Sequence, residues 1–218
     1  MRIRRNVWAL ENDPADRTLH WYAKAIASMK ARPITQHNSW RFQAAIHQYL
    51  RSQDPLAVQG EALPSASDQA NFWNRCQHNS WFFLAWHRMY LHLFEEIVAA
   101  EVLSQGGPDD WALPYWNYSR SVGEQRLPPS FRLPVDGTGA SNELYLPQRS
   151  GAANGGIPAG APSTDLTQVL RVGDYSVPAN SPAAAFCGVE TGFRRPGQSK
   201  IGNFLQRVGR FSDAAEAG

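Results

Sequence analysis

The chain has 218 residues, a formal net charge of +2 and 18% charged residues, a length that suits one core, or one core with a long irregular annex. Its balanced charge provides neither a polybasic tail for nucleic acid nor a basic patch for a membrane surface. No run approaches the roughly 20 apolar residues that span a bilayer, and the N-terminus lacks the pattern of a secretory signal. We expect a soluble protein that binds neither nucleic acid nor membrane.

The first helix is expected to begin at the pair Asp13 and Pro14, which suit the N-cap and N1 positions. Pro33 closes the segment. Between them an apolar stripe recurs at helical spacing, formed by Leu19, Tyr22, Ile26 and Met29. These features predict an amphipathic helix that packs one face against a core.

A second helix is expected to start near Asn38 or Ser39, either of which could cap it. One face of this helix carries Trp40, Ala44, His47 and Leu50 at offsets of four, three and three residues. The following residues, 51–70, have weak periodicity and a polar composition, which predicts a loop.

The third helix is expected from Leu84 to Leu103, because this stretch contains no Gly or Pro and 106–108 reads Gly-Gly-Pro. One face carries His87, Tyr90, Leu91, Phe94 and Val98. His78 precedes His87 by nine residues, about half a turn off that face. We therefore place His78 on a turn that leads into the helix.

The second half of the chain has the composition of long loops. Residues 121–218 hold nine of the fifteen prolines, fourteen of the seventeen glycines and no histidine. Short helices are expected only near Thr164–Arg171 and Gly202–Val208. We expect a single domain over 1–218, with a helical region at 1–105 and a loop-rich region at 106–218.

Two histidines, His78 and His87, lie among large aromatic residues in the segment 72–96. Three imidazoles suffice to hold a copper or zinc ion with one open position. His47 lies on an apolar helix face, where a lone histidine is more often a satisfied core residue. His92 is about 140° round the helix from His87, and His20 has no neighbour that suits a metal. The pair in the aromatic segment argues for a metal site.

The motif His78-NSWFFLAW-His87-Arg-Met-Tyr, followed by Leu-Phe-Glu at 93–95, resembles the copper-A half of the tyrosinase and polyphenol oxidase family, relatives of the hemocyanins. The segment SWRFQAAIHQYL, which contains His47, is similar to the family's upstream ligand element. Segments 109–119 and 142–156 also match, so the resemblance covers roughly residues 15 to 195. It implies copper ligands at His47, His78 and His87.

The resemblance also implies a fold and an activity. The fold would be mainly α, half of a type 3 copper four-helix bundle with two to three core helices, followed by the Pro- and Gly-rich irregular region. The activity would be copper-dependent oxidation of phenols or o-diphenols to o-quinones with O2. Cys76 stands where some members form a thioether, here with His78, and Asn79 or Glu95 could orient the ligand rings.

The family's second copper site has no counterpart in this sequence. That site needs three more histidines, usually a His-x-x-x-His pair and a later one, and no histidine follows His92. The segment AFCGVETGF at 185–193 still resembles the region before the B site. We therefore expect a truncated copper-A half, or one completed by another polypeptide. The isolated chain should bind at most one copper and have little or no catechol oxidase activity.

Two alternatives from other classes remain open. One is a hemocyanin-like oxygen-binding protein, which catechol oxidation by the completed protein would argue against. The other is a three-histidine zinc hydrolase, which metal analysis showing zinc without copper would favour. Cellular location is also open, since some bacterial relatives carry no leader and are exported with a helper protein.

Overall fold

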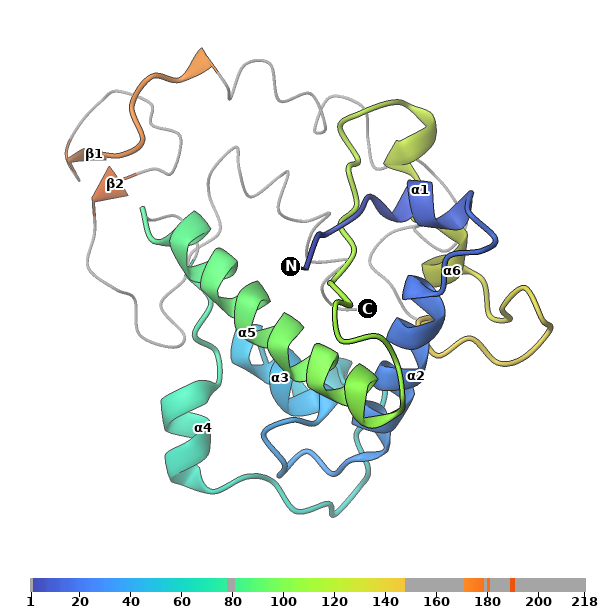
Figure 1. Cartoon of the computed structure of the whole chain (residues 1–218). Coiled ribbons are helices and arrows are strands. Elements are labelled where there is room, and N and C mark those ends of the chain that lie inside the picture. Colours follow the sequence, from blue (N-terminus) through green and yellow to red (C-terminus); the bar gives the residue numbers. More distant parts are fainter. Residues whose placement is uncertain (1, 78–80, 148–170, 179, 181–188, 191–218) are drawn as a thin grey trace. The chain divides into compact units, whose positions relative to one another are not determined.

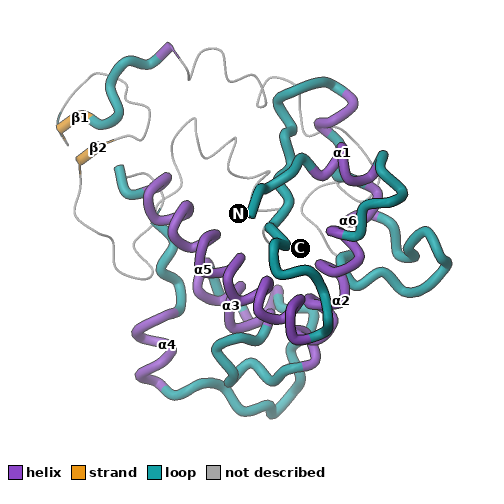
Figure 2. The backbone as a smooth tube through the Cα atoms, in the orientation of Figure 1, coloured by secondary structure: helices purple, strands orange, loops and turns teal. Residues whose placement is uncertain are grey.

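The computed structural model describes residues 2–77, 81–147, 171–178, 180 and 189–190 (Figure 1). The described part is mainly helical, which confirms the predicted fold class. The tube in Figure 2 shows strand only at β1, Val177–Pro178, and β2, Val189–Glu190, which pair in parallel. None of the described helices combines the length and apolar character needed to cross a membrane.

The described chain divides into two compact units. The first contains residues up to Ala31 and those from Phe94 to 147, and the second contains Arg32–Leu93 with the described residues from 171 onward. The longest helix, α5 (Phe83–Ser104), contributes its amino half to the second unit and its carboxyl half to the first. The single domain expected over 1–218 stays a prediction.

The first unit has an apolar core. Its helices are α1 (Val7–Glu11), α2 (Thr18–Ala31), the carboxyl half of α5, and α6 (Pro129–Arg132), with a 3-10 turn at Gly123–Gln125. The buried side chains include Tyr22, Ile26, Met29, Val98 and Val102. The Trp111 indole donates to the Thr18 carbonyl at 3.1 Å, and its ring lies 5.7 Å from that of Tyr22. Of the predicted stripe on α2, three residues are therefore buried.

The start of α2 differs from the prediction. The helix begins at Thr18, four residues after Pro14, and not at Pro14 itself. The Asp13 side chain accepts a hydrogen bond from the Ala15 amide at 3.2 Å, and Asp16 accepts one from the Thr18 amide at 2.7 Å. In both turns an aspartate side chain accepts a hydrogen bond from a backbone amide two residues later. The segment from Asp13 to Arg17 is held in this turn conformation and does not enter the helix.

The second unit is built on α3 (Trp40–His47) and the amino half of α5. Ser39 caps α3, as predicted, because its hydroxyl accepts from the Phe42 amide at 3.1 Å. The buried face of α3 contributes Phe42 and Ala45 to an apolar cluster that also contains Ile34 and Trp73. Leu50 does not extend the helix face: it lies beyond the end of α3 and is 45% exposed.

The segment 51–70 is only partly the loop that the sequence predicted. It contains a 3-10 turn at Arg51–Gln53 and the start of α4 (Ala66–Phe72). The Ser65 hydroxyl accepts from the Asp68 amide at 3.0 Å and contacts the Asp68 carboxylate at 2.8 Å. This local cap begins a helix that weak apolar periodicity could not reveal.

An ionic network fixes the loop that follows α3. Arg41 is only 8% exposed and makes a two-pronged contact with Glu61 at 2.6 and 2.7 Å. Its guanidinium also contacts Asp54 at 2.7 Å. The hydrogen bonds from Arg41 hold the pKa of the Glu61 carboxyl below its usual value. A buried cation is therefore satisfied by two carboxylates.

The predicted third helix is confirmed, since α5 spans Phe83–Ser104 where the sequence predicted Leu84–Leu103. The chain turns away after Ser104 at Gly106, as expected, with φ of +82°, a conformation that costs glycine little. The Gly107 amide donates to the Val102 carbonyl at 2.9 Å. The short helices expected near 164–171 and 202–208 lie outside the described residues, apart from Arg171.

Candidate metal centre

A hydrogen bond between side chain and backbone joins the two helices that carry His47 and His87. The Tyr90 hydroxyl on α5 donates to the Gln43 carbonyl on α3 at 2.8 Å. Tyr90 follows His87 by three residues and Gln43 precedes His47 by four, so each lies on the same helix face as its histidine. The bond therefore joins the two helices on the faces that carry the imidazoles.

Residues 74–76 run against the end of α3 and place Cys76. The Asn74 amide donates to the Ala45 carbonyl at 3.0 Å, and the Arg75 amide donates to the Ile46 carbonyl at 2.8 Å. The Asn74 side chain in turn accepts from the Tyr49 amide at 2.8 Å. These bonds occupy the last carbonyls of α3, which explains why the helix stops at His47.

The chain reverses sharply at Asn74, which has φ of +55°. Among residues other than glycine, asparagine tolerates this left-handed conformation best, because its short polar side chain can bond locally. Two residues later the Cys76 sulfur meets the histidines. The turn at Asn74 therefore allows Cys76, which is 29 residues after His47 in the sequence, to contact this residue of α3.

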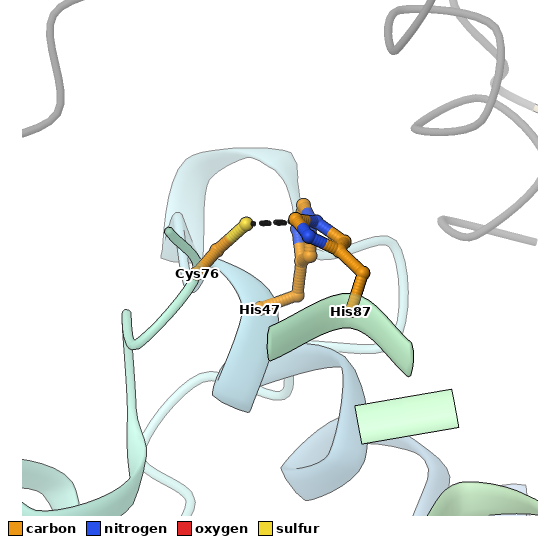
Figure 3. Close-up of side chains that lie close together, drawn as sticks. All are labelled: His47, Cys76 and His87. Atoms are coloured by element: carbon orange, nitrogen blue, oxygen red, sulfur yellow. Dashed lines mark hydrogen bonds between the residues drawn. The ribbon is translucent and has the colours of Figure 1, made fainter. Parts of the chain in front are cut away.

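His47, Cys76 and His87 form a compact group of donor atoms (Figure 3). The Cys76 Sγ atom lies 3.0 Å from His47 Nε2 and 3.2 Å from His87 Nε2. The ligand atoms of the three residues all lie within 4.8 Å of one another. His87 is buried, and the other two are half-buried.

The orientation of His87 is fixed by its own helix. Its Nδ1 atom lies 2.6 Å from the Phe83 carbonyl oxygen, which can only accept a hydrogen bond. Nδ1 therefore carries the proton, and in the neutral ring Nε2 presents a lone pair towards Cys76. Ligating histidines in metalloproteins commonly donate their second nitrogen in this way.

Aromatic rings enclose the two imidazoles. The His87 ring has its centroid 4.4 Å from Phe83 and 4.9 Å from Trp86. The His47 centroid is 6.1 Å from Trp86 and 6.2 Å from Tyr90, and the last two rings stack 5.1 Å apart. Such surroundings limit water and lower the local polarity, both of which tune a redox metal.

Two other residues singled out from the sequence, His78 and Asn79, fall outside the described residues. Glu95 is nearly buried and forms an ion pair with Arg4. Its role in orienting a ligand ring, like the ligand role of His78, stays a prediction.

The remaining described histidines do not join the group. His37 is exposed and lies 3.5 Å from Asp68, with its ring against Phe42 and Phe72. His20 and His92 are exposed. The sequence interpretation set His20 and His92 aside as ligands, and that assignment stays a prediction.

The donor set suits copper. Two imidazole nitrogens and one sulfur are ligands that copper accepts, and aromatic surroundings are typical of its redox sites. The sequence interpretation assigned Cys76 a bond to His78, and did not expect its sulfur to lie against both His47 and His87. That position depends on the Asn74 turn, which no local sequence pattern predicts.

The chain belongs to the tyrosinase family. Residues 37–188 match the model described as the common central domain of tyrosinase, and this range contains all three residues of the group. The family uses copper, which agrees with the donor set described above.

Individual relatives are consistent with this assignment. The chain is 40% identical over 159 residues to tyrosinase HcTyr1 of Hahella sp. (strain CCB-MM4), which covers 71% of this chain and 31% of that protein. It is 30% identical over 115 residues to a chloroplastic polyphenol oxidase of Spinacia oleracea, covering 52% and 16%. The chain thus spans about a third or less of the length of these relatives.

Solved structures of similar proteins are also found. A latent apple tyrosinase aligns with a TM-score of 0.47 at 28% identity, covering 70% of this chain and 28% of that one. A tyrosinase from Burkholderia thailandensis aligns with a TM-score of 0.44 at 20% identity, covering 66% and 25%.

Proposed function

We propose that this chain provides the copper-A part of a tyrosinase-type oxidoreductase, with His47, His78 and His87 as its copper ligands. The observation that carries the proposal is the convergence of His47 and His87 from separate helices, with the His87 lone pair fixed by the Phe83 carbonyl. The family match over 37–188 supports copper as the metal that this pair of histidines would bind.

The reaction of the complete protein would oxidise phenols or o-diphenols to o-quinones with O2. Two catechols together lose four electrons and four protons, and these reduce one O2 to two waters. Copper, when bound, supplies the redox chemistry between the two. The residues of this chain hold the ligand nitrogens in place through the Tyr90–Gln43 bond and restrict water through Trp86 and Phe83.

A second copper would need ligands beyond those in this sequence. No histidine follows His92, and the family's B site uses three. We propose that additional polypeptide, either a continuation of the chain or a separate protein, supplies them. The 218-residue chain by itself should then bind one copper and oxidise catechol little or not at all.

Copper titration of single variants tests the ligand assignment. His47→Ala, His78→Ala and His87→Ala should each weaken copper binding at least about tenfold, whereas His92→Ala and His20→Ala, at exposed positions, should leave it unchanged. Two coppers bound per chain, or equal affinity in all five variants, would contradict the proposal.

Metal preference and activity separate the alternatives. Zinc bound in preference to copper would favour the hydrolase. Addition of a B-half polypeptide from a tyrosinase should produce catechol oxidation, measured as quinone absorbance. Reversible O2 binding without catechol oxidation by that completed protein would instead support an oxygen carrier.

The thioether between Cys76 and His78 is also part of the proposal. Its formation removes one hydrogen from the thiol and one from the ring, with O2 as the oxidant. Intact mass should therefore fall by the mass of two hydrogens after copper and O2 are supplied. An unchanged mass would show that no link forms.

A further inference from the structure

The position of the Cys76 sulfur leads to a second role for this residue, which rests on the proposed copper site. We infer that, before any cross-link forms, Cys76 is a direct ligand of Cu(I), together with His47 and His87. The uncross-linked chain would thus bind copper with one thiolate and two imidazoles rather than with three imidazoles.

The geometry brings the sulfur to both rings at once. It lies 3.0 Å from His47 Nε2 and 3.2 Å from His87 Nε2. A thiol hydrogen is weakly donated and would be shared between two nitrogens, whereas one cation can bind all three donors at full strength. The mutual approach of the three donor atoms therefore suits a common ion.

The distances are compatible with an ion of ordinary size. Ligands bound at about 2.3 Å for sulfur and 2.0–2.1 Å for nitrogen stand roughly 3.5 Å apart in a tetrahedral site. The observed separations of 3.0 and 3.2 Å are shorter by less than about half an ångström. A small outward movement of the Cys76 side chain would open the group enough.

The donor chemistry selects the metal. Thiolate is a soft ligand that favours Cu(I), and imidazole suits copper in both oxidation states. Binding replaces the thiol proton with the ion and releases the proton to solvent. Formation of the thioether with His78 would later consume the thiolate, so this site would precede the three-histidine site in the life of the protein.

The test uses the 218-residue chain purified without copper under reducing, anaerobic conditions, with intact mass confirming both thiols. Cu(I) affinity is measured by competition with a chromophoric chelator. Cys76→Ser should weaken Cu(I) binding more than about 100-fold, beyond the effect of losing an outer-shell partner. Cys187→Ala, at the chain's other cysteine, is the matched control and should bind like the parent chain.

A spectroscopic measurement gives an independent readout. X-ray absorption of the Cu(I) complex should show one sulfur scatterer at about 2.3 Å, absent in Cys76→Ser and retained in Cys187→Ala. Co(II) should likewise give a thiolate charge-transfer band in the parent chain and in Cys187→Ala, but not in Cys76→Ser. These signals report ligation and do not require an active enzyme.

The possible failures can be told apart. Two results together would overturn this inference while leaving the histidine ligands intact: Cu(I) affinity of Cys76→Ser within twofold of the parent chain, and no sulfur scatterer in the Cu(I) complex of the parent chain. Full Cu(I) affinity in both His47→Ala and His87→Ala would overturn the proposed copper site itself. A thioether already present in protein that never met copper would also overturn the inference, because no thiolate would be available.

Discussion

The two halves of α5 differ in what holds them. In the carboxyl half, Val98 and Val102 are completely buried. In the amino half, Met89 is 58% exposed and Leu93 55% exposed, while the buried residue is His87. One continuous helix therefore packs by apolar burial at one end and carries a proposed metal ligand at the other.

This contrast separates stability from site geometry. Apolar burial contributes most of the folding free energy and has no preferred direction. A hydrogen bond such as that from Tyr90 to Gln43 contributes only about 0.5–1.5 kcal/mol net but is directional. We therefore expect substitutions in the carboxyl half to lower the free energy of unfolding, and those in the amino half to alter metal affinity instead.

The strongest test introduces a charge into the carboxyl half. Val98→Asp should lower the free energy of unfolding by about 4 kcal/mol or more, because the carboxylate would be buried without a partner. Met89→Asp, at the exposed site on the same helix, should change it by less than about 0.5 kcal/mol. Urea unfolding followed by tryptophan fluorescence measures both. Equal losses would remove the contrast between the halves.

The second unit has its own stabilising group in Arg41. Arg41→Met should lower the free energy of unfolding by about 3 kcal/mol, because Glu61 and Asp54 would lose the cation that they share. The side chains of these two acids are only 14% and 12% exposed. The Met side chain keeps much of the apolar stem. Arg120→Met, at a pair with 63% exposure on the arginine, should cost less than about 1 kcal/mol.

The same variant should change the response to acid. Arg41 lowers the pKa of Glu61 in the folded state, so this stabilisation is fully present above the unfolded pKa and is lost as pH falls through the folded one. The parent chain should therefore lose stability as pH falls below about 4.5, near the ordinary carboxyl value. Arg41→Met should show a shallower decline over that range, and an identical slope would contradict the assigned cause.

Local signals predicted most of the helical framework. The absence of Gly and Pro from 84 to 103, with Gly106 beyond it, defined α5 to within one residue at each end. Ser39 likewise marked the start of α3. The end of α3 was missed because Asn74 and Arg75, far along the chain, take its last carbonyls. Competition of that kind is invisible in a local pattern.

The candidate site was predictable in part for the same reason. The helical faces and the family motif brought His47 and His87 into one hypothesis, and the structure places them together. The contact of Cys76 with both rings depends on the left-handed turn at Asn74, so spacing alone could not predict it. The ligand role of His78 stays a prediction from the resemblance.

The end of α5 gives a smaller test of the carboxyl half. A Cβ atom on Gly107 would lie 2.4 Å from Val102 Cγ1 and 2.9 Å from the Val102 carbonyl oxygen. Gly107→Ala should therefore cost about 2 kcal/mol through overpacking. Gly123→Ala, where nothing lies within 4 Å of the new atom, is the control and should be close to neutral. Thermal unfolding of both variants measures the difference in their stability. Equal stability of the two variants would show that the end of α5 relaxes and accommodates the added methyl group.

The smallest change in stability should accompany a clear change in the site. Tyr90→Phe removes the hydroxyl that donates to Gln43 and should lower the free energy of unfolding by only about 1 kcal/mol. Copper affinity should fall about tenfold, because His87 is then held less firmly against His47. Tyr115→Phe, at a residue 47% exposed in the first unit, should leave both quantities unchanged. Unaltered copper affinity in Tyr90→Phe would mean that backbone packing, and not this bond, aligns the two histidines.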